Sequence, residues 1–157
     1  MNTLNQLTDK IREWAKDHPF INDYGIGPVS MVGMKEPMRF PYLWTSMKTG
    51  TILINHNVVP IPTFQFLFMD KTNKSIEINR DNNGLDTTDG MEVVSDTYRL
   101  VLDFIKWLDD LDGISIESNQ ISVQPIIDET KEIATGWLVE ISIKMVFIQC
   151  NDIVKQN

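Results

Sequence analysis

The stretch WLVEISIKMVF, residues 137–147, decides the fold class of this chain. Its apolar residues occupy alternate positions, and Glu140, Ser142 and Lys144 lie between them. Successive side chains of a strand point to opposite faces of a sheet, so this period of two predicts a long strand with one buried and one largely solvated face. The apolar set comprises Trp137, Val139, Ile141, Ile143, Met145 and Phe147. Such a pattern is typical of an antiparallel sheet.

The sequence predicts one helix before the strands in the middle of the chain and a second helix after them. Residues 3–17 carry apolar side chains at three- and four-residue steps, and Pro19 ends that helix. The stripe comprises Leu4, Leu7, Ile11 and Trp14. The second helix is expected from Met91 to about Asp110, before the Asp112-Gly113 turn. It carries two adjacent apolar seams: Val94, Tyr98, Val101, Ile105 and Leu108 in one, and Leu100, Phe104, Trp107 and Leu111 in the other. One seam is expected to face the sheet and the other to face the first helix or a neighbouring subunit.

The middle of the chain predicts several shorter strands. Thr49-Gly50 is expected to turn one hairpin, and Pro60 and Pro62 to interrupt the chain before its next strand. The expected strands are Val29–Met34, Tyr42–Met47, Thr51–Val58, Thr63–Met69, Ile114–Ile116 and Ile121–Pro125. Together these elements predict one α+β domain over residues 1–157, a mostly antiparallel sheet flanked by two helices.

Two polar segments lie outside this framework. Residues 71–90 are expected to form a long exposed loop with a short hairpin arm through Ser75 to Asn79, and loops of this length are usually functional or mobile. Residues 149–157 form a polar tail. Both are predicted to contact neighbouring subunits, through Asn82, Leu85 and Asp86 in the loop and Ile153 in the tail.

Composition excludes several classes of protein. The chain carries 22 acidic against 14 basic residues, a net charge of −8, which disfavours binding to a phosphate backbone. Cys150 is the only cysteine, so no internal disulfide is possible. No signal peptide is visible, and no apolar run approaches the roughly 20 residues that cross a bilayer. We expect an intracellular product that does not contact membranes.

Catalytic and metal-binding candidates are few. The histidines, His18 and His56, are far from Cys150 in sequence, and nothing local supports a dyad. A partial calcium-loop pattern begins at Asn79, but its twelfth position is Gly90 where a glutamate is required. The sequence therefore predicts no enzyme, no cofactor and no metal.

The aromatic residues carry the remaining signal. The four tryptophans fall in different predicted elements, and we expect them to meet in one core. Phe40, Tyr42 and Trp44 follow an exposed-looking loop and are predicted to anchor an interface between subunits.

Several segments, in order along nearly the whole chain, resemble a structural protein of crAss-like phages that infect Bacteroidetes. They are DHPFIN at 17–22, YGIG at 24–27, PYLW at 41–44, FMD at 68–70, EVVSDT at 92–97, TGW at 135–137, and Cys150. The family is that of tail-completion or tail-terminator-like neck ring proteins. The loop at 71–90 is longer than this family leads us to expect.

This resemblance implies a location and a symmetry. It implies a six- or twelve-fold homo-oligomeric ring at the portal-to-tail junction of the virion, between a portal-side ring and tail proteins. Genomic DNA would pass through the ring without specific binding, and no catalytic residues are implied. The alternatives are a baseplate or tail adaptor protein, a small binding module, or an enzyme with a concave pocket of perturbed titratable groups.

Overall fold

A computed structural model describes residues 3–32, 38–55, 57–71, 79–80, 86–87, 89–118, 120–127 and 134–145. The helices are α1 (Leu4–Asp17) and α2 (Asp89–Asp109), with a 3₁₀ turn, η1 (Val29–Met31), between them in sequence. The strands are β1 (Asp23–Ile26), β2 (Tyr42–Asn55), β3 (Asn57–Lys71), β4 (Asn79–Arg80), β5 (Asp86–Thr87), β6 (Ile114–Ile116), β7 (Ser122–Ile127) and β8 (Ala134–Met145).

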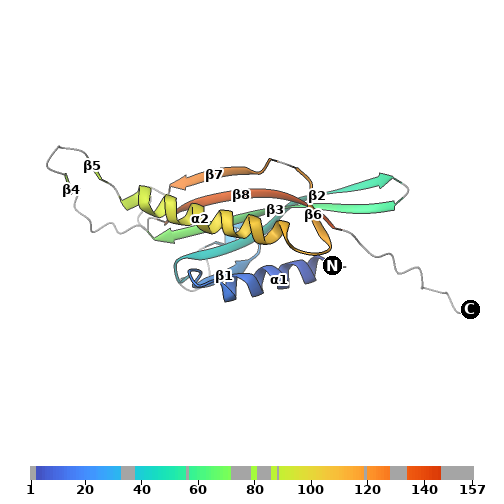
Figure 1. Cartoon of the computed structure of the whole chain (residues 1–157), viewed down its shortest axis with the longest axis horizontal. Coiled ribbons are helices and arrows are strands. Elements are labelled where there is room, and N and C mark those ends of the chain that lie inside the picture. The colour runs from blue at the N-terminus through green and yellow to red at the C-terminus, as the bar shows by residue number, and fades with distance from the viewer. Residues whose placement is uncertain are drawn as a thin grey trace, which may run out of the picture.

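One six-stranded sheet organises the molecule, in the order β1-β2-β3-β8-β6, with β7 also paired to β8. Every pairing is antiparallel except that of β1 with β2. Both helices pack on one face of this sheet, with α2 running along its length (Figure 1). The predicted α+β class is therefore confirmed.

The last long strand behaves as its alternation predicts. Val139, Ile141, Ile143 and Met145 of β8 are all buried on the helix side, and Phe147 lies outside the described residues. Trp137 is only partly buried, because it packs at the edge of the core. Its indole N–H donates to the Val94 carbonyl of α2 (2.9 Å). Gly136 keeps β8 close to β3, since a Cβ there would overlap the backbone of Phe68.

Helix α1 begins and ends as the sequence predicts. The Thr3 hydroxyl caps it by accepting from the Gln6 N–H (3.2 Å), and the chain turns away at His18, before Pro19. Its buried residues are Leu7, Ile11 and Ala15.

Helix α2 uses both of its apolar seams within the chain. Phe104 is fully buried, and its ring lies 4.6 Å from that of Phe66 and 5.0 Å from that of Trp14, between centroids. Trp107 stacks on Trp14 at 5.7 Å, so the second seam faces α1. Gly113, with φ of +81°, then turns the chain into β6.

Three local predictions are wrong. Val29–Met31 form a 3₁₀ turn where a strand was expected. Thr49-Gly50 do not turn the chain, because β2 passes through them with a bulge between Met47 and Thr49 and continues to Asn55. Strand β3 likewise runs through Pro60 and Pro62, which pair with Ile52 and Gly50.

The tryptophans also do not share one core. Trp14, Trp107 and Trp137 lie on the helix side of the sheet, whereas Trp44 belongs to a second apolar cluster with Tyr42, Leu67 and Met69. The sheet separates the two clusters, since Trp44 is adjacent along β2 to Leu43, which points to the opposite face.

Candidate assembly surface

The most prominent surface feature is the far half of the β2–β3 hairpin, which we call the arm (residues 49–63). It extends past the helices and the rest of the sheet (Figure 1). Among the described residues, its strands pair only with each other up to Thr63. The arm carries no charged residue, and it exposes Ile52 (62%), Ile54 (81%) and Val58 (57%) to solvent. Apolar side chains gathered on one projection of a protein commonly mark a site of interaction.

The orientation of the backbone in the arm follows from one hydrogen bond. The Thr45 carbonyl accepts from the Gly27 N–H (3.0 Å), so the backbone of Thr45 faces away from β3. Residues directly opposite each other in an antiparallel ladder either both face inward or both face outward. Phe66 is opposite Thr45, and it therefore faces away from β2, towards β8.

Two prolines consequently close one edge of the arm. The extra residue of the bulge belongs to β2, so the alternation along β3 continues undisturbed from Phe66 to Pro62 and Pro60. Both prolines place their nitrogens on the outer edge of β3, where they offer no N–H to an added strand. Prolines are a common means of protecting a sheet edge from unwanted pairing.

The opposite edge of the arm has no such protection. Gly50, Ile52 and Ile54 lie opposite Pro62, Pro60 and Val58, so their N–H and C=O groups face outward. Among the described strands, β1 covers β2 only as far as Thr45. The arm is therefore asymmetric, with a closed β3 edge and an open β2 edge.

The outer edge of the sheet at β7 is closed in the same way. Trp137 lies opposite Phe68, so its backbone faces β3 rather than β7. Pro125 is paired with Trp137 and hence turns its nitrogen outward. All three of these prolines thus turn their nitrogens to a side on which no described strand pairs with them.

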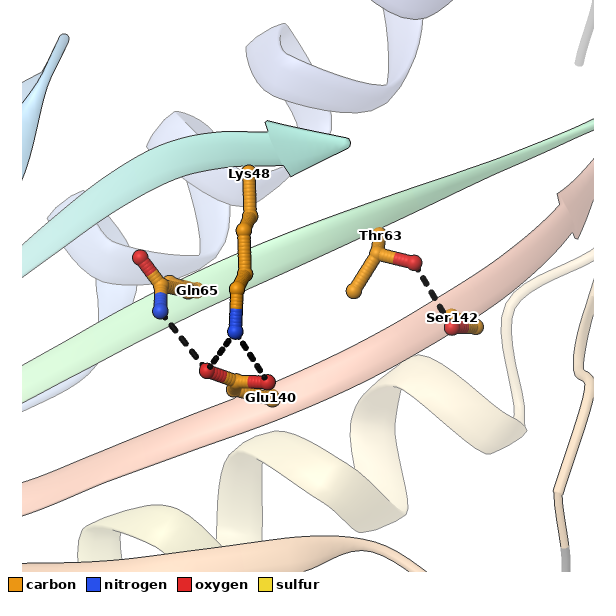
Figure 2. A network of polar contacts seen from close by, with 5 residues as sticks. All are labelled: Lys48, Thr63, Gln65, Glu140 and Ser142. Atoms are coloured by element: carbon orange, nitrogen blue, oxygen red, sulfur yellow. Dashed lines mark hydrogen bonds and ion pairs between the residues drawn. The ribbon is translucent and has the colours of Figure 1, made fainter. Parts of the chain in front are cut away.

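A polar network ties the root of the arm to β8. Figure 2 shows Lys48, Gln65 and Glu140 pointing toward one another across three neighbouring strands. The Lys48 ammonium donates to both Glu140 carboxylate oxygens (2.8 and 3.1 Å), and the Gln65 amide donates to one of them (2.7 Å). These hydrogen bonds hold the pKa of Glu140 below its ordinary value. Thr63 and Ser142 add a hydroxyl pair at 2.8 Å.

Two of the residues predicted to anchor an interface between subunits, Tyr42 and Trp44, are covered within the chain on the sheet face away from the helices. Their exposed fractions are 5% and 3%, because they pack with Leu67 and Met69 in the second apolar cluster. The Trp44 indole also donates to the Gly27 carbonyl (2.9 Å) and lies against Gly25, where a Cβ would overlap its ring. Phe40 is half-buried beside this cluster.

The other predicted contact residues fall on the remaining polar segments. Asn82, Leu85 and Ile153 lie outside the described residues, as does His56. Asp86 is in β5, which pairs with β4 through a two-residue ladder. The arm itself was missed, although the uncharged run from Thr49 to Thr63 and its prolines were visible in the sequence.

A separate acidic cavity of about 450 Å³ lies at the opposite end of β2 and β3 from the arm, between α2 and the segment that follows α1, with Asp70 at the end of β3. Asp70, Asp96 and Asp103 line it together with Arg99 and the exposed ring of Phe20. Burial raises the pKa of Asp70 above its ordinary value, and the nearby Asp96 adds to that shift. Within the described part of the chain, no three potential metal-ligating side chains cluster closely enough to hold an ion.

Comparison with known proteins adds no relative, since no protein-family model and no curated protein sequence matches this chain. Neither described helix has an apolar stretch long enough to cross a membrane.

Proposed function

We propose that this protein is a non-enzymatic structural subunit that assembles head to tail into a ring at the neck of a tailed phage, at the portal-to-tail junction. The observation that carries the proposal is the arm, a hairpin without charged residues that projects beyond the folded domain and exposes Ile52, Ile54 and Val58 on its strands. An isolated two-stranded hairpin is marginally stable in water, so a long one is best explained by a partner.

The projection of the arm beyond the body of the domain favours a ring over a simple dimer. A two-fold dimer uses the same patch on both copies, whereas a ring needs two different, complementary surfaces. The arm and the body of the domain are different surfaces, and the arm of one copy can contact the body of the next. The resemblance to neck ring proteins adds the location, and the net charge of −8 suits a conduit through which DNA passes without adhering.

The test is the mass distribution of the purified protein over a concentration series, with negative-stain images of the largest species. Closed rings are expected, either from the protein alone or after mixing with portal and tail proteins. A monomer under both conditions would refute ring formation and favour an adaptor or binding module.

A matched pair of variants shows whether the arm drives assembly. Burying an isoleucine contributes about 1.5–3 kcal/mol, so Ile54→Lys should raise the concentration needed for assembly at least tenfold. Leu102→Lys is the control, because Leu102 is also exposed (49%) but lies on α2, away from the arm. Equal effects of the two substitutions would show that the arm has no special role.

A further inference from the structure

We infer that the segment after β8, residues 146–157, of one copy adds as a strand to the open β2 edge of the arm on a neighbouring copy. This inference rests on the proposed head-to-tail assembly and names the segment that makes the contact. Three observations carry it: where β8 leaves its ladder, which edge of the arm is closed, and what the segment is made of.

Strand β8 leaves β3 at the residue where the prolines begin. Its last pair with β3 is Ser142 with Thr63, although β8 itself continues to Met145. The next hydrogen-bonded pair in that register would join Ile143 to Pro62, and proline has no N–H to give. From Ile143 to Met145, β8 is instead held on its other side by β6.

The same prolines offer no N–H to a strand that would continue β8 along β3 in its own chain. A straight continuation of β8 would run along the β3 edge of the arm, where Pro62 and Pro60 turn their nitrogens outward. The open β2 edge lies on the far side of the arm from β8. The arm of a second copy presents that open edge without this obstruction.

The segment has the composition and length of an added strand. Its sequence, VFIQCNDIVKQN, contains no proline or glycine and includes the strand-favouring residues Val146, Phe147, Ile148, Ile153 and Val154. Fully extended it would span roughly 40 Å, whereas the open edge from Lys48 to Asn55 needs roughly 26 Å. The charges of its two charged side chains, Asp152 and Lys155, cancel, so the segment suits an arm that has no charged residue.

Strand addition would also account for the exposed side chains of the arm. Main-chain hydrogen bonds to Gly50, Ile52 and Ile54 would supply affinity, and contacts with the side chains of Ile52 and Ile54 would supply specificity. Closing the β3 edge with proline then leaves one edge for the partner, so each arm accepts a single strand in a defined orientation.

A matched pair of proline substitutions tests the edge. Ile54 and Val58 are cross-strand partners whose backbones both face outward, one on each edge. Ile54→Pro should raise the concentration needed for assembly about tenfold, through the loss of one added-strand hydrogen bond and its neighbouring contacts, whereas Val58→Pro should leave it within about twofold. Thermal unfolding of both variants checks that the hairpin is intact. Equal effects of the two prolines would overturn the inference.

Cross-linking tests the segment, because Cys150 is the only cysteine in the chain. One copy carries Leu53→Cys with Cys150→Ser and is mixed with the unmodified chain, under assembly conditions, with a flexible bis-maleimide. A covalent pair that requires both copies is expected. As a control, the Leu53→Cys, Cys150→Ser copy alone should give little product, and an equal yield from it would indicate pairing between two arms and refute the inference.

The outcomes separate this inference from the proposed function. Rings without the mixed cross-link would overturn the strand addition and leave the ring intact. A third chain, which carries Leu53→Cys and keeps Cys150, tests pairing within one copy. A link between these two cysteines inside one chain, formed in preference to links between chains, would show pairing in cis and would also overturn the inference. The mixed cross-link in the absence of closed rings would support the strand addition and count against the ring.

Discussion

Phe104 is the side chain on which the two-helix core depends most directly. It is fully buried on α2, and its ring lies 4.6 Å from Phe66, 5.4 Å from Phe68, 5.0 Å from Trp14 and 5.7 Å from Trp107, between centroids. The ring therefore joins α1, α2 and β3. We expect Phe104→Ala to destabilise the fold more than any exposed substitution on the same helix.

The expected magnitude follows from the surroundings of the ring. Replacing a buried phenylalanine with alanine costs about 3–5 kcal/mol, and the loss of several aromatic contacts places Phe104→Ala towards the upper end of that range. For a chain of this size, about 1 kcal/mol corresponds to roughly 2–4 °C in Tm, so a loss of roughly 10–15 °C is expected.

The assay is urea and thermal unfolding followed by circular dichroism, at concentrations low enough to keep assembly from adding stability. Leu102→Ala is the control on the same helix, since Leu102 is 49% exposed and its loss should cost less than about 0.5 kcal/mol. A loss below about 1.5 kcal/mol for Phe104→Ala would refute the central position assigned to this ring.

Three further predictions concern the sheet. Gly136→Ala should lower the free energy of unfolding in urea by about 1–3 kcal/mol, because its Cβ would overlap the Phe68 backbone. Gly50→Ala is the control and should be tolerated, because a Cβ there would make only ordinary contacts. Equal losses for the two variants would contradict this packing. Folding lowers the pKa of Glu140, so the contribution of Glu140 to the free energy of unfolding is present above the unfolded pKa and is lost as pH falls through the folded pKa. Glu140→Gln should therefore narrow the difference in stability between neutral and acidic pH. An unchanged dependence of stability on pH would argue against the Lys48 contact. Asp70 should have the opposite effect on stability, because burial raises its pKa in the folded protein. Asp70→Asn should stabilise the protein at neutral pH and lose that advantage below the unfolded pKa. Destabilisation by Asp70→Asn at pH 7 would show that burial is not the dominant effect.

Much of the architecture could be predicted from local patterns. The alternation in residues 137–147 predicted the buried face of β8. The stripe of Leu4, Leu7, Ile11 and Trp14 predicted which side of α1 packs inward, although Leu4 at its start is exposed. Such periods depend on backbone geometry alone, 3.6 residues per turn in a helix and two in a strand, so they can be read without knowing the partner.

The arm and its two edges could not be predicted in this way. Pro60 and Pro62 were expected to interrupt a strand, because proline cannot donate to a ladder. Only the register with β2 and the end of the β8 ladder show that their nitrogens face a free edge, where no donor is needed.

The burial of Trp44 was likewise decided by tertiary structure. The sequence by itself determined the α+β class, the two helices and the face of β8 that is buried. The tertiary structure alone decided that Trp44 is covered on the sheet face away from the helices, whereas Ile54 is left exposed on the arm. The physical reason is that burial of a strand residue depends on which other elements lie over it, and those elements come from distant parts of the chain.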